Sequence, residues 1–197
     1  MKVITLIDND FDIAAHRLSD MVMADFSPDL AVGVLSGGAV VAKALMERFE
    51  QAGLHCTYTQ LRLQRQSTPR KQTPIVAWTI RVLPTMLLDW LRMVEAAWRE
   101  LTAPKTMPTD SISLPDDVAD AASKSHRILV VDDAIDTGLT AARIVAALKT
   151  INPDADIRIA VIASTMKHPL ITANYCLLPH HVLVRFPWSA DLKPSHK

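Results

Sequence analysis

The sequence predicts an α/β domain in which helices flank a mostly parallel sheet. Short apolar runs alternate with amphipathic stretches along the chain, which is the pattern of consecutive strand–helix units. Four of the five glycines fall in two short segments at the ends of apolar runs, where a strand has to turn into a helix. Together with a length of 197 residues, these observations favour a single domain that carries an embellishment.

The periodicity of the apolar residues defines each element in turn. Short apolar runs predict strands, spacings of three and four residues predict helices, and glycine or proline ends them. In chain order, the sequence predicts a strand at residues 2–7, a helix at 11–26, a strand at 30–35, a helix at 39–50, a strand at 55–63, a polar loop at 64–72, a helix at 83–101, a linker at 102–125, a strand at 127–131, a turn at 132–138, a helix at 139–149, a strand at 157–163 and a last apolar run at 182–186.

Two of these helices carry further information. We expect Asp8, Asp10 and Asp12 to cap and charge the start of the first helix, where carboxylates favour the positive end of the dipole. The helix at 83–101 has an unusually wide apolar face that includes Trp90 and Trp98. Such a face is buried either within the chain or against a second copy, and we expect a homodimer.

The composition excludes several classes of protein. Lysine plus arginine equal aspartate plus glutamate at 21 each, so no net charge recruits nucleic acid or an anionic membrane. The most apolar stretch, residues 74–91, is interrupted by Arg81 and Asp89, whereas a membrane span needs ~18 uninterrupted apolar residues. The N-terminus shows no leader pattern, and Cys56 and Cys176 have no disulfide spacing. We therefore expect a cytoplasmic protein without nucleic-acid or membrane partners.

The most informative segment is residues 128–140, ILVVDDAIDTGLT. Its apolar strand delivers Asp132 and Asp133 to the carboxyl end of a parallel strand, the edge where open α/β sheets bind ligands. The next residues open a helix whose backbone N–H groups and dipole favour a phosphate, with Thr137 and Thr140 adding hydroxyls. Gly138 lets the backbone approach such an anion. Carboxylates beside a phosphate cradle can accept hydrogen bonds from sugar hydroxyls or hold a metal, so ribose 5-phosphate suits both halves.

This segment resembles the 5-phosphoribosyl-1-pyrophosphate (PRPP) motif of the type I phosphoribosyltransferases. The resemblance implies that family's fold, a parallel sheet flanked by helices, as a single domain over residues 1–197 with a C-terminal hood at about 164–197. A helical insertion at about 75–125 is longer than the usual connection. The resemblance implies that Asp132 and Asp133 bind the ribose hydroxyls and also Mg²⁺, which would contact PRPP oxygens as well. It implies phosphate binding by the residues of the following turn, Asp136, Thr137, Gly138, Leu139 and Thr140.

Two further segments extend the resemblance. Residues 33–38, GVLSGG, look like the family's pyrophosphate-binding loop, which implies pyrophosphate contacts from Ser36, Gly37 and Gly38. Residues 60–72 look like its flexible catalytic loop, in which Arg65, Arg70 and Lys71, with Arg62, would close over the leaving pyrophosphate.

The base-binding side is similar to the xanthine/guanine type of this family. Matches at residues 168–170, Pro179 and residues 186–188 carry this likeness, and Asp136 would be the candidate general acid/base of the 6-oxopurine members. The sequence departs from the family at three positions, with Ser36 where many relatives have a cation, Ser164 where purine members have lysine, and Leu183 where they have an aromatic residue. We expect Lys167 and Trp188 to bind the base instead.

These observations favour a Mg²⁺-dependent phosphoribosyltransferase that moves phosphoribose from PRPP to a nitrogenous base, possibly a 6-oxopurine, and releases pyrophosphate. One alternative is a regulator that senses PRPP or a nucleotide without catalysis. A second is a haloacid-dehalogenase-like phosphatase built on Asp8 and Asp10, which leaves the double glycine unexplained. A response-regulator receiver is a third, but too few residues follow Asp133 for its remaining units.

Overall fold

A computed structural model describes residues 2–62, 112–179 and 182–189 of the protein. The predicted loop at 64–72, the predicted helix at 83–101 and most of the predicted insertion lie outside these residues. In the described ranges, no helix is long and apolar enough to cross a membrane.

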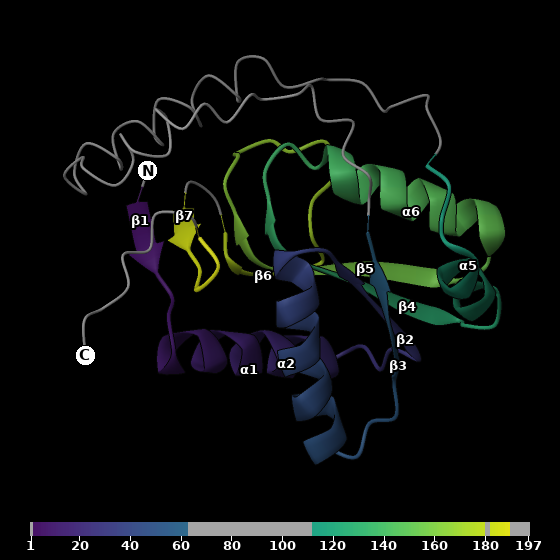
Figure 1. Ribbon diagram of the computed structural model, residues 1–197, viewed down its shortest axis with the longest axis horizontal. Helices are drawn as coiled ribbons and strands as arrows, with labels where there is room; N and C mark the ends of the chain where they lie inside the picture. The colour runs from purple at the N-terminus through teal and green to yellow at the C-terminus, as the bar shows by residue number, and fades with distance from the viewer. Residues whose placement is uncertain (1, 63–111, 180–181, 190–197) are drawn as a thin grey trace.

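The centre of the domain is a parallel five-stranded sheet in the order β3-β2-β4-β5-β6. Within the described ranges, helices lie on both faces of the sheet, α1 and α2 on one side and α5 and α6 on the other (Figure 1). The strands are β2 (Leu30–Val34), β3 (Thr57–Leu61), β4 (Arg127–Ile135), β5 (Asp156–Ser164) and β6 (Tyr175–Leu178), and the helices are α1 (Asn9–Met23), α2 (Gly37–Gln51), α5 (Asp116–Ser123) and α6 (Leu139–Ile151). This confirms the α/β fold class that the sequence predicts.

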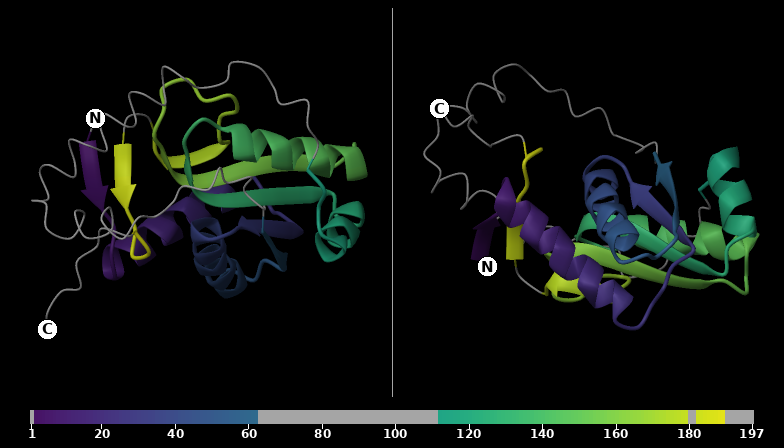
Figure 2. Two further views of the ribbon diagram at one scale, coloured as in Figure 1. Left: turned by 45° about the horizontal axis from the view of Figure 1, so that its top comes forward. Right: turned by 90° about the horizontal axis from the view of Figure 1, so that it is seen from below.

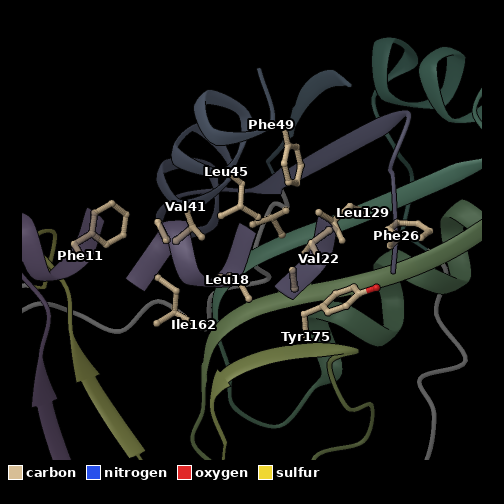
Figure 3. Packing of buried hydrophobic residues seen from close by; sticks show 14 of the residues in the cluster. Phe11, Leu18, Val22, Phe26, Val41, Leu45, Phe49, Leu129, Ile162 and Tyr175 are labelled. Carbon is tan, nitrogen blue, oxygen red and sulfur yellow. The ribbon is translucent and has the colours of Figure 1, made fainter. Parts of the chain in front are cut away.

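Alternation along the buried strands divides the core into two layers. Successive side chains of a strand point to opposite faces, so Leu129 and Val131 of β4 pack under α1 and α2 while Ile128 and Val130 pack under α6. Figure 3 shows the first layer, in which Leu18, Val22, Val41, Leu45 and Phe49 meet the sheet. Because both faces are covered, β2 and the Ile128–Val131 part of β4 are apolar throughout rather than alternating.

A glycine allows α2 to pack closely on the sheet. A Cβ on Gly33 of β2 would lie 3.0 Å from Ala39 Cα and 3.0 Å from Ala42 Cβ of the helix. Any larger residue here would push the start of α2 away from the ends of the strands.

A separate small sheet joins the two ends of the described chain. β1 (Lys2–Thr5) pairs in parallel with β7 (Val182–Arg185), and Leu6 N–H continues the ladder to Arg185 O at 2.8 Å. The pair lies apart from the large sheet, beyond the carboxyl ends of its strands (Figures 1 and 2). The N-terminal strand thus lies beside the segment that the sequence assigns to a C-terminal hood.

The segment that directly follows α1 is fixed to the sheet by a polar network. Arg158 of β5 donates to Asp25 Oδ2 at 2.9 Å and to the Tyr175 hydroxyl at 2.6 Å, and Tyr175 donates to Asp25 Oδ1 at 2.7 Å. The guanidinium also lies 4.4 Å from the centre of the Phe26 ring. The Tyr175 hydrogen bond, assisted by Arg158, lowers the pKa of Asp25 below its ordinary value.

Several local predictions were wrong. The turn expected at 132–138 is shorter, because β4 continues through the acidic pair to Ile135. The linker expected at 102–125 contains α5, whose Val118 and Ala122 are fully buried against the sheet and α6. β6 was not predicted at all, since its four residues are too few to give a pattern. Asp10 and Asp12 do lie in the first turn of α1, but Asp8 makes no side-chain cap.

Candidate active site

The carboxyl ends of β2 and β4 open into a cavity of about 360 Å³. It brings together three segments that are far apart in the sequence: the turn before α2, the end of β4 with the turn before α6, and Trp188 in the segment after β7. Its lining residues are Val34, Leu35, Ser36, Gly37, Asp132, Asp133, Ala134, Ile135, Asp136, Thr137, Gly138, Thr140, Ala141 and Trp188. Most of the residues that the sequence singled out within the described ranges therefore share one cavity.

The acidic pair is held in place by backbone and indole N–H groups. Asp132 Oδ1 accepts the N–H of Asp133 at 2.9 Å, and Asp133 Oδ1 accepts the N–H of Ala134 at 2.9 Å. Trp188 Nε1 donates to Asp133 Oδ2 at 2.9 Å. Hydrogen bonds to charged groups are the stronger kind, so Asp133 has a defined position before any ligand binds.

An aromatic cluster orients Trp188. Its ring stacks on Phe186 with centroids 4.9 Å apart and an angle of 2°, and it meets Phe11 of α1 edge to face at 5.5 Å and 84°. The sequence assigned Trp188 to the base, but it did not predict this contact with the acidic pair. No local pattern indicates it, because 55 residues separate Trp188 from Asp133.

Two glycines let the first turn of α2 lie directly against the acidic pair. A Cβ on Gly37 would overlap the Asp133 carboxylate and lie 2.6 Å from Trp188 Nε1. A Cβ on Gly38 would lie 2.6 Å from Val131 O and 2.7 Å from Asp132 Cα. Ser36, at the start of α2, is exposed at the cavity and makes no side-chain cap, and the Leu35–Ser36 peptide is cis. Gly38 lies behind the lining rather than on it.

The turn before α6 is shaped by Gly138 in the left-handed region, with φ of 78°. From the sequence, we expect this glycine to let the backbone approach an anion. The structure gives it another role, because a Cβ there would lie 2.8 Å from Ile171 N and 3.1 Å from Leu170 N. Leu170 N–H also donates to Thr137 O at 2.8 Å. The segment after β5 therefore packs against the turn.

The remaining turn residues differ in position. Thr137 and Thr140 line the cavity, and the Thr137 hydroxyl accepts the N–H of Leu139 at 3.3 Å. Leu139 itself is not among the lining residues. Asp136 lines the cavity, and its Oδ1 accepts the Thr165 hydroxyl at 2.8 Å. Thr165 was missed by sequence reasoning, although it directly follows β5, at the same sheet edge.

On the base side, the structure separates the two expected residues. Trp188 lines the cavity, whereas Lys167 is exposed and lies outside the lining. Ser164 is buried, with its hydroxyl 3.3 Å from Met166 O, and Leu183 lies on β7 opposite Val3. The catalytic-loop residues Arg65, Arg70 and Lys71 lie outside the described residues.

The cavity is strongly acidic. Three carboxylates, those of Asp132, Asp133 and Asp136, face it, and no lysine, arginine or histidine of the described ranges belongs to its lining. No three acidic, histidine or cysteine side chains in the described parts cluster closely enough to hold a metal by themselves. One or two carboxylates with substrate oxygens are nevertheless the usual ligands of Mg²⁺, so Asp132 and Asp133 fit this metal when it arrives with a phosphorylated substrate.

Comparison with known families identifies the class of protein that this geometry defines. Residues 6–176 match the family described as the phosphoribosyl transferase domain. The chain therefore belongs to the phosphoribosyltransferase family, and it is a phosphoribosyltransferase with the type I fold. The receiver and haloacid-dehalogenase alternatives fail, and Asp8 and Asp10 are not among the residues that line the cavity.

Solved structures show the same fold over most of the chain. A purine phosphoribosyltransferase from Pyrococcus horikoshii is 17% identical, with a TM-score of 0.60 over 100% of this chain and 99% of that one. Xanthine-guanine-hypoxanthine phosphoribosyltransferase from Helicobacter pylori is 14% identical, with a TM-score of 0.54 over 94% and 92%. A hypothetical protein from Neisseria gonorrhoeae with bound ppGpp is 16% identical, with a TM-score of 0.53 over 95% and 89%. Curated protein sequences give no significant match.

Proposed function

We propose that the protein transfers a 5-phosphoribosyl group from PRPP to a nitrogenous base, with a 6-oxopurine as the first candidate, and releases pyrophosphate in a Mg²⁺-dependent reaction. The observation that carries this proposal is the convergence of the acidic pair, the turn before α6 and the turn before α2 on one cavity. Two of the structural neighbours, a purine phosphoribosyltransferase and a xanthine-guanine-hypoxanthine phosphoribosyltransferase, support the choice of base class.

Each part of PRPP has a suitable partner in the cavity. The carboxylates of Asp132 and Asp133, which line the cavity, would accept hydrogen bonds from the ribose hydroxyls. The first turn of α6 offers its helix N-terminus and the hydroxyls of Thr137 and Thr140 to the 5-phosphate. The first turn of α2, with Ser36 and Gly37, faces the same space and would hold the pyrophosphate.

The reaction breaks the bond between ribose C1 and the pyrophosphate oxygen and forms a bond between C1 and a nitrogen of the base. Positive charge develops on the ribose as the leaving group departs, and the carboxylates of Asp132 and Asp133 stabilise it. Asp136 lies at the cavity and would take the proton that the base nitrogen loses. Mg²⁺ bound to PRPP would neutralise charge on the leaving pyrophosphate.

The negative charge of the cavity favours the proposal that PRPP binds together with a cation. PRPP is highly anionic, and the three facing carboxylates oppose its approach. Mg²⁺ bound to PRPP would offset this repulsion. We propose that the catalytic-loop residues Arg65, Arg70 and Lys71 reduce it further. Titration calorimetry with PRPP is therefore expected to show binding with Mg²⁺ and none with EDTA.

The direct test combines calorimetry with a pyrophosphate-release assay over hypoxanthine, guanine, xanthine, adenine, uracil and orotate. Release with one base would establish the transfer and name its acceptor. Asp133→Asn should lower kcat/KM for PRPP by about 100-fold or more. Asp120→Asn serves as the matched control, because Asp120 is exposed on α5, its carboxylate pairs with Lys124, and it is not among the residues that line the cavity.

Other outcomes would replace the proposal. PRPP binding without release for any base would establish the sensing regulator in place of the enzyme. An absence of PRPP binding with Mg²⁺ would overturn both.

The homodimer remains a prediction, to be checked by sedimentation of wild type against the double variant Trp90→Glu with Trp98→Glu. The extent of the single domain also remains a prediction.

A further inference from the structure

The ends of β4 and β5 place Thr165 beside Asp136. Ile135 and Ser164 are register partners at the carboxyl ends of these two parallel strands. Thr165 N–H then donates to Ile135 O at 2.9 Å, which adds one more backbone hydrogen bond between the two chain segments. Asp136 and Thr165 are the residues that directly follow these two strands. They therefore lie side by side at the edge of the sheet.

The Thr165 hydroxyl lies between two acceptors. Its Oγ1 is 2.8 Å from Asp136 Oδ1 and 3.3 Å from Ile135 O. A hydroxyl has one proton to donate and two lone pairs that accept. With Asp136 ionised, the hydroxyl donates to the carboxylate. With Asp136 protonated, the carboxyl can donate to Oγ1 while the hydroxyl turns to Ile135 O.

We propose that Thr165 is a positioning residue for Asp136, holding the carboxyl in one place before and after it takes a proton from the base. This inference rests on the proposed function. Thr165 is not among the residues that line the cavity, so it acts through Asp136 rather than on the substrate. Its neighbour Ser164 offers no substitute, because that hydroxyl is buried and turned to Met166 O.

The local backbone does not depend on the hydroxyl. Thr165 N–H to Ile135 O and Leu170 N–H to Thr137 O are backbone hydrogen bonds that Thr165→Val retains, and valine has nearly the same shape as threonine. Thr165→Ser keeps the hydroxyl and loses only the methyl group. This pair of variants separates the hydrogen bond from the packing of the side chain.

The test compares kcat and KM for both substrates in four proteins. Thr165→Val is expected to lower kcat by about 10-fold or more, the size expected from losing one hydrogen bond to a charged group, with KM for PRPP within about twofold. Thr165→Ser should keep kcat within about threefold. Thr150→Val, which removes an exposed hydroxyl of α6 bonded to Ala146 O, should match wild type.

A double-mutant cycle with Asp136→Asn completes the test. Because Thr165 acts through Asp136, Thr165→Val should add no further loss to Asp136→Asn. The inference would be overturned by an unchanged kcat in Thr165→Val, by additive losses, or by a raised KM for PRPP together with a lowered melting temperature. A wild-type protein that releases no pyrophosphate with any base would overturn the proposed function itself, and this inference with it.

Discussion

Replacing Gly37 with alanine tests how closely the first turn of α2 fits the acidic pair. Alanine is the better helix former by about 0.8–1.0 kcal/mol, so in open space the substitution would stabilise α2. Here the new Cβ would overlap the Asp133 carboxylate and lie 2.6 Å from Trp188 Nε1. Both obstacles are side-chain atoms, so we expect them to move rather than the helix.

The magnitude follows from the hydrogen bond that this movement breaks. Trp188 Nε1 donates to Asp133 Oδ2 at 2.9 Å, and a hydrogen bond to a charged group contributes about 1.5–3 kcal/mol. Since each 1.36 kcal/mol is a factor of ten in rate, kcat/KM for PRPP should fall by about 10- to 150-fold. The measurement is the initial rate of pyrophosphate release at subsaturating PRPP, with melting followed by circular dichroism.

Two other glycine variants provide the comparison. Gly53→Ala meets no atom within 4 Å but must adopt a φ of 76°, so it should lose about 1–2 kcal/mol of stability and keep full activity. Gly38→Ala would press on backbone atoms of Val131 and Asp132 and should lose both stability and activity. If Gly37→Ala kept kcat/KM within twofold of wild type, the fit between α2 and Asp133 would not matter for catalysis.

Three further outcomes are expected. Trp188→Phe keeps a ring against Phe186 and Phe11 but loses the N–H donor to Asp133, so kcat/KM for PRPP should fall about 10-fold with little change in melting temperature; an unchanged value would contradict the role of the indole N–H. The Tyr175 hydrogen bond, with Arg158, lowers the pKa of Asp25 below 3.8, so the stabilisation is present above that pH and lost as the pH falls through the lowered pKa. The difference in melting temperature between wild type and Asp25→Asn should therefore shrink from about pH 5 to about pH 2, and a constant difference would oppose this account. Partial burial, with Asp29 nearby, raises the pKa of the Cys56 thiol to about 12, so a thiol reagent at about pH 8 should modify it more slowly in the folded protein than in urea; equal labelling rates of Cys56 in the two states, measured in a Cys176→Ser background, would refute this account.

The sequence pattern was enough to predict the layered α/β fold and the polar residues that share the cavity. Continuous apolar runs such as Ile128 to Val131 indicate strands that are covered on both faces. Between these runs, apolar residues spaced three and four apart indicate the helices that cover the sheet. The acidic pair directly follows one such apolar run, and Gly37 and Gly38 come just after another. Because parallel strands present their carboxyl ends at one edge, strand order is not needed to bring these groups together. Local pattern was sufficient for this part of the site.

Tertiary structure alone decided the contacts that join distant segments. Trp188 reaches Asp133 across 55 residues, and Thr165 reaches Asp136 across 29. The pairing of β1 with β7 and the burial of α5 likewise depend on which surfaces meet. The need for a residue without a Cβ at position 138 also depends on a distant segment, because the backbone of Ile171 lies against Gly138. Periodicity and turn residues report the neighbours of a residue along the chain, whereas these contacts are set by strand register and packing between elements, which no local window of sequence contains.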